Sequence, residues 1–253
     1  MNPSLVQYIL HLADNSFING HRLSEWCGHG PALEVDMALS NIALDNIGAA
    51  RSFYQYAAQL EGGDKTEDYY PHWRTLREFR NVLLVELPNG DFADTIARSF
   101  FFDAYQFLFY KALTNSKDLQ LAAIAEKSLK EVTYHLRFSS EWVIRLGDGT
   151  EESKERMQAS IHKLWDYTGE LFSASDTEKE MIDAGIATDI SLLKPEWDKI
   201  ISDTLEEATL SYPLRADGAW FQNGGKRGIH TEHFGFILAE VQYMQKTYPG
   251  AEW

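Results

Sequence analysis

Apolar residues recur every three or four positions along most of the chain, which is the pattern of amphipathic α-helices. The pattern predicts four long helices, each spanning roughly 30 Å or more at 1.5 Å per residue. These four helices cover residues 4–27, 32–60, 92–113 and 118–146. Shorter helices are predicted over 71–83, 150–172, after 176, after 195 and from 231, with a glycine-rich loop over 211–230.

Clusters of glycine and proline lie next to ends of the long helices. They lie at residues 28–31, 62–64, 88–90 and 147–149. Such short turns make consecutive helices antiparallel, and the sequence has no internal repeat or obvious linker. We therefore expect an all-α fold, a four-helix bundle with additional C-terminal helices, forming a single domain over residues 1–253.

The helix predicted over 92–113 is rich in aromatic residues, including three consecutive phenylalanines at 100–102. Taken alone, this run would also suit a β-strand. Its length and its flanking turns favour a helix that is buried on most sides.

Composition limits the classes of function. The chain has 253 residues, of which 38 are acidic and 23 basic, for a net charge of −15. This balance argues against binding to nucleic acid or to an anionic membrane surface. Cys27 is the only cysteine, which rules out an internal disulfide and a multi-thiolate zinc site. With no basic leader and no long apolar run, we expect a cytoplasmic protein.

Polar residues on the predicted inward faces suggest a comparison with di-metal carboxylate bundles. Such sites take one carboxylate from each of two helices and an acidic-x-x-His pair from each of two others. The long helices here offer Asp45, Asp103 and His135. Gly48 stands where the first pair needs histidine, and Val132 where the second needs an acid. The strict pattern therefore fails.

An ordinary structural role is the alternative, because a single aspartate usually faces solvent and a single histidine is usually a hydrogen-bonded core residue. Asp45 and Asp103 have apolar sequence neighbours, so we expect both to be buried. We expect them to approach His135 inside the bundle, with Arg51 or Arg98 as further counterions and no metal between them.

Four longer motifs carry a family resemblance. They are LSEWCGHGPALEVDMALSNIALDNIGAARSF, ELPNGDFADTIARSFFFDAY, SLKEVTYHLRFSSEWVIRLGDGT and GGKRGIHTEH. In this order they resemble the C subunits of bacterial phenylacetyl-CoA epoxidases (phenylacetyl-CoA monooxygenases), over essentially the whole chain. The resemblance implies a ferritin-like bundle and a place in aerobic phenylacetate catabolism.

The resemblance also implies a division of labour. The C subunit is the non-catalytic structural companion of a related catalytic A subunit that holds the di-iron centre. A small B subunit and a reductase with flavin and iron–sulfur groups complete the complex. This chain would then bind no cofactor itself and would not be catalytic alone. The alternatives are a di-iron oxidase active in its own right and a free-standing helical scaffold.

The ligand positions of the related catalytic subunit transfer onto this chain with losses. The resemblance places the first-helix carboxylate at Ser16 and the second-helix pair at Asp45 and Gly48. It keeps the third-helix aspartate as Asp103. The last pair falls on Val132 and His135, so at most three of six ligands survive and the site is vestigial.

The loop before the last predicted helix contains Gly224, Gly225, Lys226 and Arg227. A glycine-rich basic loop can bind phosphate through backbone N–H groups, so contact with a partner or with an anion such as the phosphates of coenzyme A is one hypothesis. The loop lacks P-loop spacing, which disfavours nucleotide binding. The histidines at 230 and 233 suggest a metal site, but capping or packing is the more ordinary role.

An interface is the last expectation. The resemblance implies a heterodimer with the catalytic subunit, in which two related bundles pack by pseudo-two-fold symmetry. The first two helices are the surface that we expect to form this interface. These two helices carry more large apolar residues than a single inward-facing stripe requires. The additional residues are Trp26, Leu39, Phe53 and Tyr54. Without the partner, the chain would form a homodimer through the same face.

Overall fold

The computed structural model describes residues 2–213 and 220–251. Over these residues the chain is 73% helical and has no β-strand. The predicted all-α class is therefore confirmed. The chain divides into two compact units: unit 1 comprises Met1–Pro88 and Gly224–Trp253, and unit 2 comprises Asn89–Asn223. The single domain over 1–253 stays a prediction.

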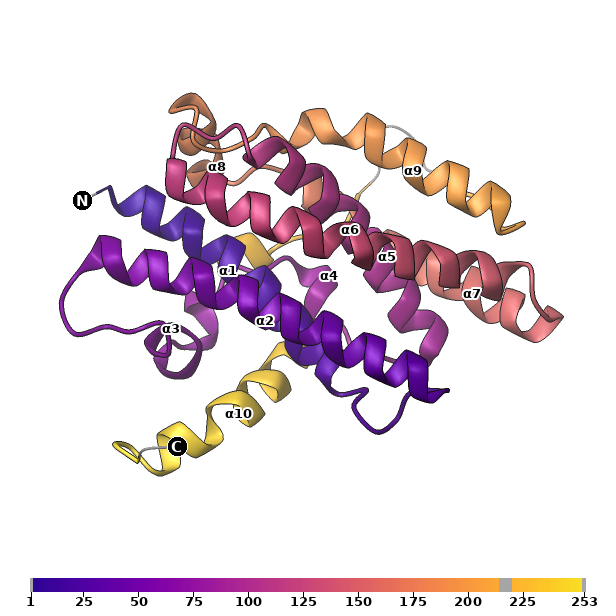
Figure 1. Cartoon of the computed structure of the whole chain (residues 1–253), viewed down its shortest axis with the longest axis horizontal. Coiled ribbons are helices and arrows are strands. Elements are labelled where there is room, and N and C mark those ends of the chain that lie inside the picture. Colours follow the sequence, from indigo (N-terminus) through magenta and orange to yellow (C-terminus); the bar gives the residue numbers. More distant parts are fainter. Residues whose placement is uncertain (1, 214–219, 252–253) are drawn as a thin grey trace. The chain divides into compact units, whose positions relative to one another are not determined.

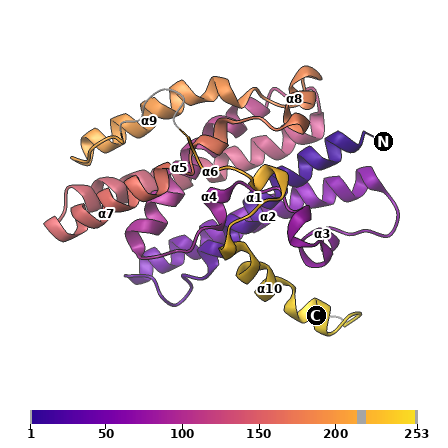
Figure 2. The same ribbon diagram turned by 180° about the vertical axis from the view of Figure 1, so that it is seen from behind.

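Unit 1 is built on a pair of long antiparallel helices, α1 (Pro3–Ser24) and α2 (Leu33–Glu61), which lie side by side in Figures 1 and 2. Asn2 caps α1 by accepting hydrogen bonds from the backbone N–H groups of Ser4 and Leu5. Helix α10 (Glu232–Thr247) packs against α1 and against two short helices, α3 (Tyr69–Trp73) and α4 (Leu83–Glu86).

The single helix predicted over 71–83 is wrong. The segment forms α3, a 3₁₀ turn at Leu76–Glu78 and α4, with extended residues between them. Side chains of α1 explain the interruption: Arg80 N–H donates to Asp14 Oδ2 (2.9 Å) and Val82 N–H to Asn15 Oδ1 (2.8 Å). Backbone groups satisfied in this way no longer need helical partners.

Unit 2 contains the second pair of long helices, α5 (Phe92–Leu113) and α6 (Leu119–Gly147), also side by side in Figure 1. It continues with α7 (Glu151–Trp165), α8 (Asp176–Asp183) and α9 (Lys194–Glu207). The helix predicted over 150–172 is too long, because a 3₁₀ turn at Gly169–Phe172 follows α7 instead of a further α-helical turn. The other long helices end close to their predicted positions.

Helix α5 is buried on most sides, as its aromatic sequence predicted. It packs against α6, α7 and α9 within unit 2. Phe100, Phe101 and Phe102 are all fully buried. Trp197 of α9 packs near Phe101 and donates its indole N–H to the Phe101 carbonyl oxygen (3.0 Å). Most residues of α5, including most of its polar residues, are therefore buried.

The predicted orientation of α2 about its own axis needs correction. Its buried positions are Val35, Leu39, Ile42, Ala43, Asn46, Ala49, Ala50, Phe53, Tyr54 and Ala57. Asp45 and Gly48, expected inside, are only partly buried. The physical reason is the hydrophobic effect. Burying the large apolar side chains of Leu39, Ile42 and Phe53 stabilises the fold more than burying an aspartate or a glycine does.

The loop predicted over 211–230 is non-helical where the structure describes it, apart from a 3₁₀ turn at Gly225–Arg227. Residues 214–219 of this prediction lie outside the described residues.

Candidate functional site

Asp103 is the buried carboxylate that the sequence placed at the vestigial site. It lies on α5 with 1% of its surface exposed, and His135 and Ser139 of α6 are equally buried. Loss of hydration raises the pKa of Asp103 to about 6, and the neighbouring His135 and the Ser139 hydroxyl offset only part of that rise. Burial of Asp103 is therefore confirmed, together with its proximity to His135.

The surroundings of Asp103 leave hydrogen-bonding capacity unused. Its Oδ1, Ser99 Oγ and Gln106 Oε1 are buried atoms with no hydrogen-bond partner among the described residues. The three residues are spaced by four and three positions, so they share one face of α5. A buried polar atom without a partner costs about 1–3 kcal/mol. This strip therefore costs stability in unit 2.

The other positions of the transferred pattern are distributed over both units. Val132 is buried on α6, one turn before His135. Ser16 is buried on α1, whereas Asp45 and Gly48 are partly exposed on α2, so the expected burial of Asp45 is wrong. The approach of Asp45 to Asp103 stays a prediction, because the two residues belong to different units.

The donor set does not fit a di-iron centre. Gly48 and Val132 offer no side-chain donor atom, and such a centre normally takes six protein ligands. Within the described residues, no three His, Cys, Asp or Glu side chains are grouped so that they could hold a metal ion. No catalytic step is therefore assigned to a metal on this chain.

The two arginines expected as counterions have other contacts. Arg98 donates a hydrogen bond to Asn89 Oδ1 (2.6 Å). Arg51 is an exposed residue that pairs with Glu67 (3.1 Å) on the surface. The groups that lower the pKa of Asp103 are His135 and Ser139 instead.

Sequence reasoning missed a second buried carboxylate, Asp14 on α1. It is fully buried and accepts hydrogen bonds from the Tyr54 hydroxyl (2.7 Å), from Arg74 Nη1 (3.1 Å) and from the Arg80 N–H (2.9 Å), and Arg74 Nη2 also contacts it. Burial alone would lower the pKa of Arg74, but Asp14 raises it above its ordinary value. Burial and the nearby Asp14 also raise the pKa of Tyr54.

A sequence signal for this network existed. Asp14, Asn15 and Asn19 are polar residues on a helix that is otherwise largely apolar, and all three are buried. Asn19 donates to Asn46 Oδ1 of α2 (3.2 Å), so the polar stripe also fixes the α1–α2 pair. A buried polar stripe on one helix thus indicates a hydrogen-bond network here and not a metal site.

A third buried cluster joins α4 to the start of α10. The side chains of Glu86 and His230 are fully buried, and Glu86 Oε2 lies 2.8 Å from His230 Nδ1. His230 Nε2 lies 3.1 Å from the Phe79 carbonyl oxygen, and Asn81 Nδ2 donates to Glu86 Oε2 (2.8 Å). Both ring nitrogens of His230 thus have partners, which argues against the metal interpretation of the histidines at 230 and 233.

The glycines of the 224–228 loop have a packing explanation. A Cβ on Gly225 would lie 2.0 Å from the Asn81 carbonyl oxygen, so only glycine fits there. The N–H groups of Arg227, Gly228 and Ile229 bond inside the loop, to the carbonyl oxygens of Gly224, Gly225 and Gly224. These three N–H groups are therefore occupied, and Lys226 is buried, so the anion contact of this loop stays a prediction.

The whole chain matches one known protein family. The family described as "Phenylacetic acid catabolic protein" covers residues 1–253. The chain belongs to this family. That description names a catabolic role and no reaction, so membership by itself assigns no catalytic chemistry to this chain.

One curated relative is the C subunit of the 1,2-phenylacetyl-CoA epoxidase of Escherichia coli (strain K12). It is 48% identical over 249 residues, which cover 98% of this chain and 99% of that protein. The predicted family resemblance is confirmed by this match. None of the helices in the described parts of the chain has the length and apolar character needed to cross a membrane.

Proposed function

We propose that this chain is the non-catalytic structural subunit of a multicomponent phenylacetyl-CoA epoxidase in aerobic phenylacetate catabolism. It supports a related catalytic subunit that holds the di-iron centre and works with a small subunit and a flavin and iron–sulfur reductase. The chain binds no cofactor itself and acts in the cytoplasm. The relationship of this chain to the C subunit of the Escherichia coli 1,2-phenylacetyl-CoA epoxidase supports its assignment to such a complex.

The chemistry of the donor positions supports the non-catalytic role. Gly48 and Val132 replace a histidine and a carboxylate that the resemblance would require, and neither side chain can coordinate iron. Asp45, Asp103 and His135 remain, but three protein ligands fall short of the six that a di-iron centre normally takes.

Iron analysis tests this role. The chain is purified after expression with added ferrous iron, and bound iron is measured together with the ultraviolet–visible spectrum. We expect substoichiometric iron and no oxo-bridge absorption band. Near-stoichiometric iron with such a band would instead identify an oxidase active in its own right.

An exposed apolar stripe on α2 is the surface proposed for the catalytic subunit. Leu33, Met37 and Leu44 are 73%, 57% and 68% exposed, and their spacing of four and seven places them on one face of the helix. A Cβ on Gly48, farther along the same face, would meet nothing within 4 Å. Glycine weakens a helix, and here it leaves room for close approach by another helix.

This stripe corrects the residues predicted for the interface. Leu39, Phe53 and Tyr54 are buried, because they form the core contacts of α2, and Trp26 is only partly exposed. The proposal that the first two helices form the interface is kept, but it now depends on the opposite face of α2.

Co-expression with the catalytic subunit and size-exclusion chromatography test the stripe. We expect the wild-type chain to co-elute with that subunit and Leu44→Glu to elute separately, since a charge would be buried there. Leu192→Glu is the matched control, because Leu192 is 74% exposed in unit 2. Separate elution of the wild-type proteins would contradict the proposed function. A homodimer of the isolated chain that Leu44→Glu abolishes would show that copies use the same face.

A further inference from the structure

The buried contact between Glu86 of α4 and His230, just before α10, requires a shared proton. His230 Nε2 lies 3.1 Å from the Phe79 carbonyl oxygen. A carbonyl oxygen can only accept a hydrogen bond, so Nε2 carries a proton. His230 Nδ1 lies 2.8 Å from Glu86 Oε2. A second proton must lie between these two atoms, because otherwise a ring lone pair would face a carboxylate oxygen at hydrogen-bond distance.

The other contacts of Glu86 assign this second proton to the imidazole. Asn81 Nδ2 donates to Glu86 Oε2 (2.8 Å), and the Thr231 N–H donates to Oε1. Both carboxylate oxygens thus accept hydrogen bonds, as an ionised glutamate does. Among the described residues no lysine or arginine pairs with this carboxylate. Arg22 donates to the backbone carbonyl oxygen of Glu86 instead (2.8 Å). A doubly protonated His230 is therefore the counterion of a fully buried carboxylate.

The His230 ring also lies at one end of a stack of aromatic rings. It stacks on Phe234 of α10, with 4.2 Å between the ring centroids, and Phe234 packs edge-on against Phe79 (5.3 Å). The guanidinium carbon of Arg74 lies 4.2 Å from the centroid of the Phe79 ring. Arg74 is the partner of Asp14, so the stack joins two buried ion pairs of unit 1. A cation over an aromatic face is a favourable contact, which suits a protonated His230.

Polar contacts attach α10 to the rest of unit 1 at its start and around Gln242. At the start, Glu86 binds both His230 and the N–H of Thr231, the residue before the helix. Farther along, Gln242 Nε2 donates to two backbone carbonyl oxygens in and just after α3 (2.9 and 2.8 Å). The two places are thus about three helical turns apart.

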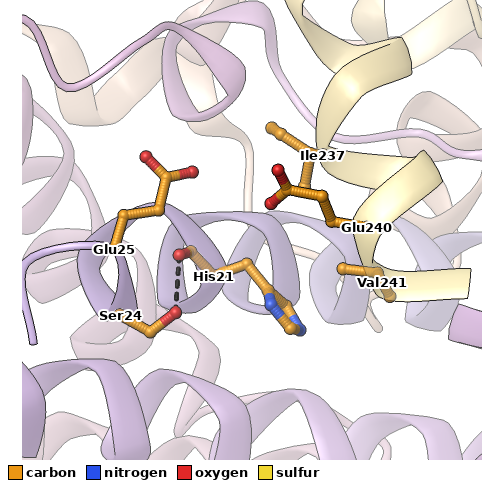
Figure 3. Close-up of a pocket in the computed structure, with 6 residues that line it drawn as sticks. All are labelled: His21, Ser24, Glu25, Ile237, Glu240 and Val241. Carbon is orange, nitrogen blue, oxygen red and sulfur yellow. Dashed lines mark hydrogen bonds between the residues drawn. The ribbon is translucent and has the colours of Figure 1, made fainter. Parts of the chain in front are cut away.

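A cleft between these two places separates the middle of α10 from the end of α1 (Figure 3). Its volume is about 190 Å³, and Ile237, Glu240 and Val241 line it opposite His21, Ser24 and Glu25. Helix α10 is therefore not packed tightly along its whole length, and its start depends on the buried contacts with Glu86.

We propose that Glu86 and His230 form a proton-dependent latch that fixes the start of α10 on unit 1. Loss of the shared proton to solvent leaves the buried carboxylate without a counterion and facing the Nδ1 lone pair. The attached state binds this proton more tightly than a detached state in which both groups are hydrated. Attachment of α10 therefore weakens as the pH rises, because proton release favours detachment. The latch concerns this chain alone and does not depend on the proposed function.

The other titratable and charged side chains on the surrounding elements do not contact the pair within the described part of the chain. They are His11, Arg22 and Glu25 on α1, Arg77, Glu78 and Arg80 before α4, Lys226 and Arg227 in the loop, and Glu232 and His233 on α10. Two histidines near the middle of α10 act in the opposite direction. Burial lowers the pKa of His21 to about 4 and also lowers the pKa of His72. Protonation of either therefore opposes burial, so their effect strengthens attachment as the pH rises.

The experiment follows the full wild-type chain by NMR from about pH 6 to about pH 9. The ring nitrogen signals of His230 report how many protons the imidazole carries. Amide hydrogen-exchange protection factors, which correct for the intrinsic pH dependence of exchange, report the attachment of α10. We expect two ring protons at about pH 6, and a loss of about tenfold in α10 protection as His230 loses one of them.

Three variants assign the effect to the latch. Glu86→Gln and His230→Gln should each remove the pH dependence of α10 protection, because neither variant retains the ion pair. His233→Gln is the matched control, since this histidine lies three positions farther along and contacts neither member of the pair among the described residues. It should keep the wild-type pH dependence.

Several outcomes would overturn the latch. One is a single ring proton on His230 at about pH 6. Another is α10 protection that stays constant or rises as His230 loses a proton, a rise being the sign expected for His21 and His72. A third is loss of the pH dependence in His233→Gln. If the glutamine variants do not fold, the wild-type titration still decides.

Discussion

Two buried carboxylates, one in each unit, have very different surroundings. Asp14 in unit 1 is surrounded by donors: the Tyr54 hydroxyl, the Arg74 guanidinium and the Arg80 N–H. Asp103 in unit 2 is as deeply buried, yet its Oδ1 has no partner among the described residues. The same chemical group is thus a structural cross-link in unit 1 and a cost to stability in unit 2.

The difference in hydrogen-bond partners indicates which of the two carboxylates stabilises the fold. A site built for stability satisfies its charge with an opposite charge and several hydrogen bonds. Asp103 has only His135 and Ser139 to offset its loss of hydration. The environment of Asp103 is therefore not one that an ionised carboxylate stabilises.

The largest expected effect comes from breaking the satisfied site. Arg74→Met leaves Asp14 as a buried charge without its counterion, and we expect the free energy of unfolding to fall by about 3–5 kcal/mol. Urea denaturation followed by circular dichroism measures it. Arg51→Met is the control, because the exposed pair of Arg51 with Glu67 should contribute about 0–1 kcal/mol. Similar losses for both variants would contradict the special role of Asp14.

Asp103→Asn should act in the opposite direction. A pKa raised from 3.8 to about 6 corresponds to at most about 3 kcal/mol against the ionised form. We therefore expect Asp103→Asn to stabilise the protein by about 1–3 kcal/mol near pH 8, measured by the same denaturation. Asp14→Asn is the matched substitution, and it should destabilise. A loss of stability in Asp103→Asn would mean that the ionised carboxylate is satisfied after all.

The pH dependence of stability gives an independent measure of Asp103. Its pKa is higher in the folded state than in the unfolded state, so between about pH 4 and 6 the folded state binds more protons. Its contribution to stability is therefore present at low pH and is lost as the pH rises through about 6. We expect the difference in unfolding free energy between wild type and Asp103→Asn to change across this window. A difference independent of pH would contradict the assignment.

The contrast also explains how much of the structure could be predicted from the sequence. Helical periodicity and the glycine–proline turns were enough to predict the long helices, because those signals are local. The aromatic run of α5 correctly predicted burial, and therefore the burial of Asp103. The orientation of α2 failed because Asp45 and Gly48 were placed inside by analogy with a metal site, whereas large apolar side chains determine the inward face.

The hydrogen-bond network around Asp14 could not be predicted from sequence patterns within single helices. Its partners at positions 54, 74 and 80 lie 40 to 66 residues away in sequence. The segment that supplies Arg74 and Arg80 was predicted to be one helix, and its interruption depends on the contacts with α1. The three polar residues at 14, 15 and 19 were a visible signal of a buried network, but not of its partners.

The smallest effects come from removing one neutral donor from each carboxylate. Tyr54→Phe removes a hydroxyl from Asp14, which keeps Arg74 and the Arg80 N–H, so we expect a loss of about 1–2 kcal/mol. Ser139→Ala removes a group that lowers the pKa of Asp103, so that pKa should rise further. Its cost should therefore appear near pH 8, where Asp103 is ionised, and shrink near pH 5, where it is protonated. Denaturation of both variants at the two pH values provides the comparison. A Ser139→Ala cost that is equal at the two pH values would show that Ser139 supports the packing of α6 and not the charge of Asp103.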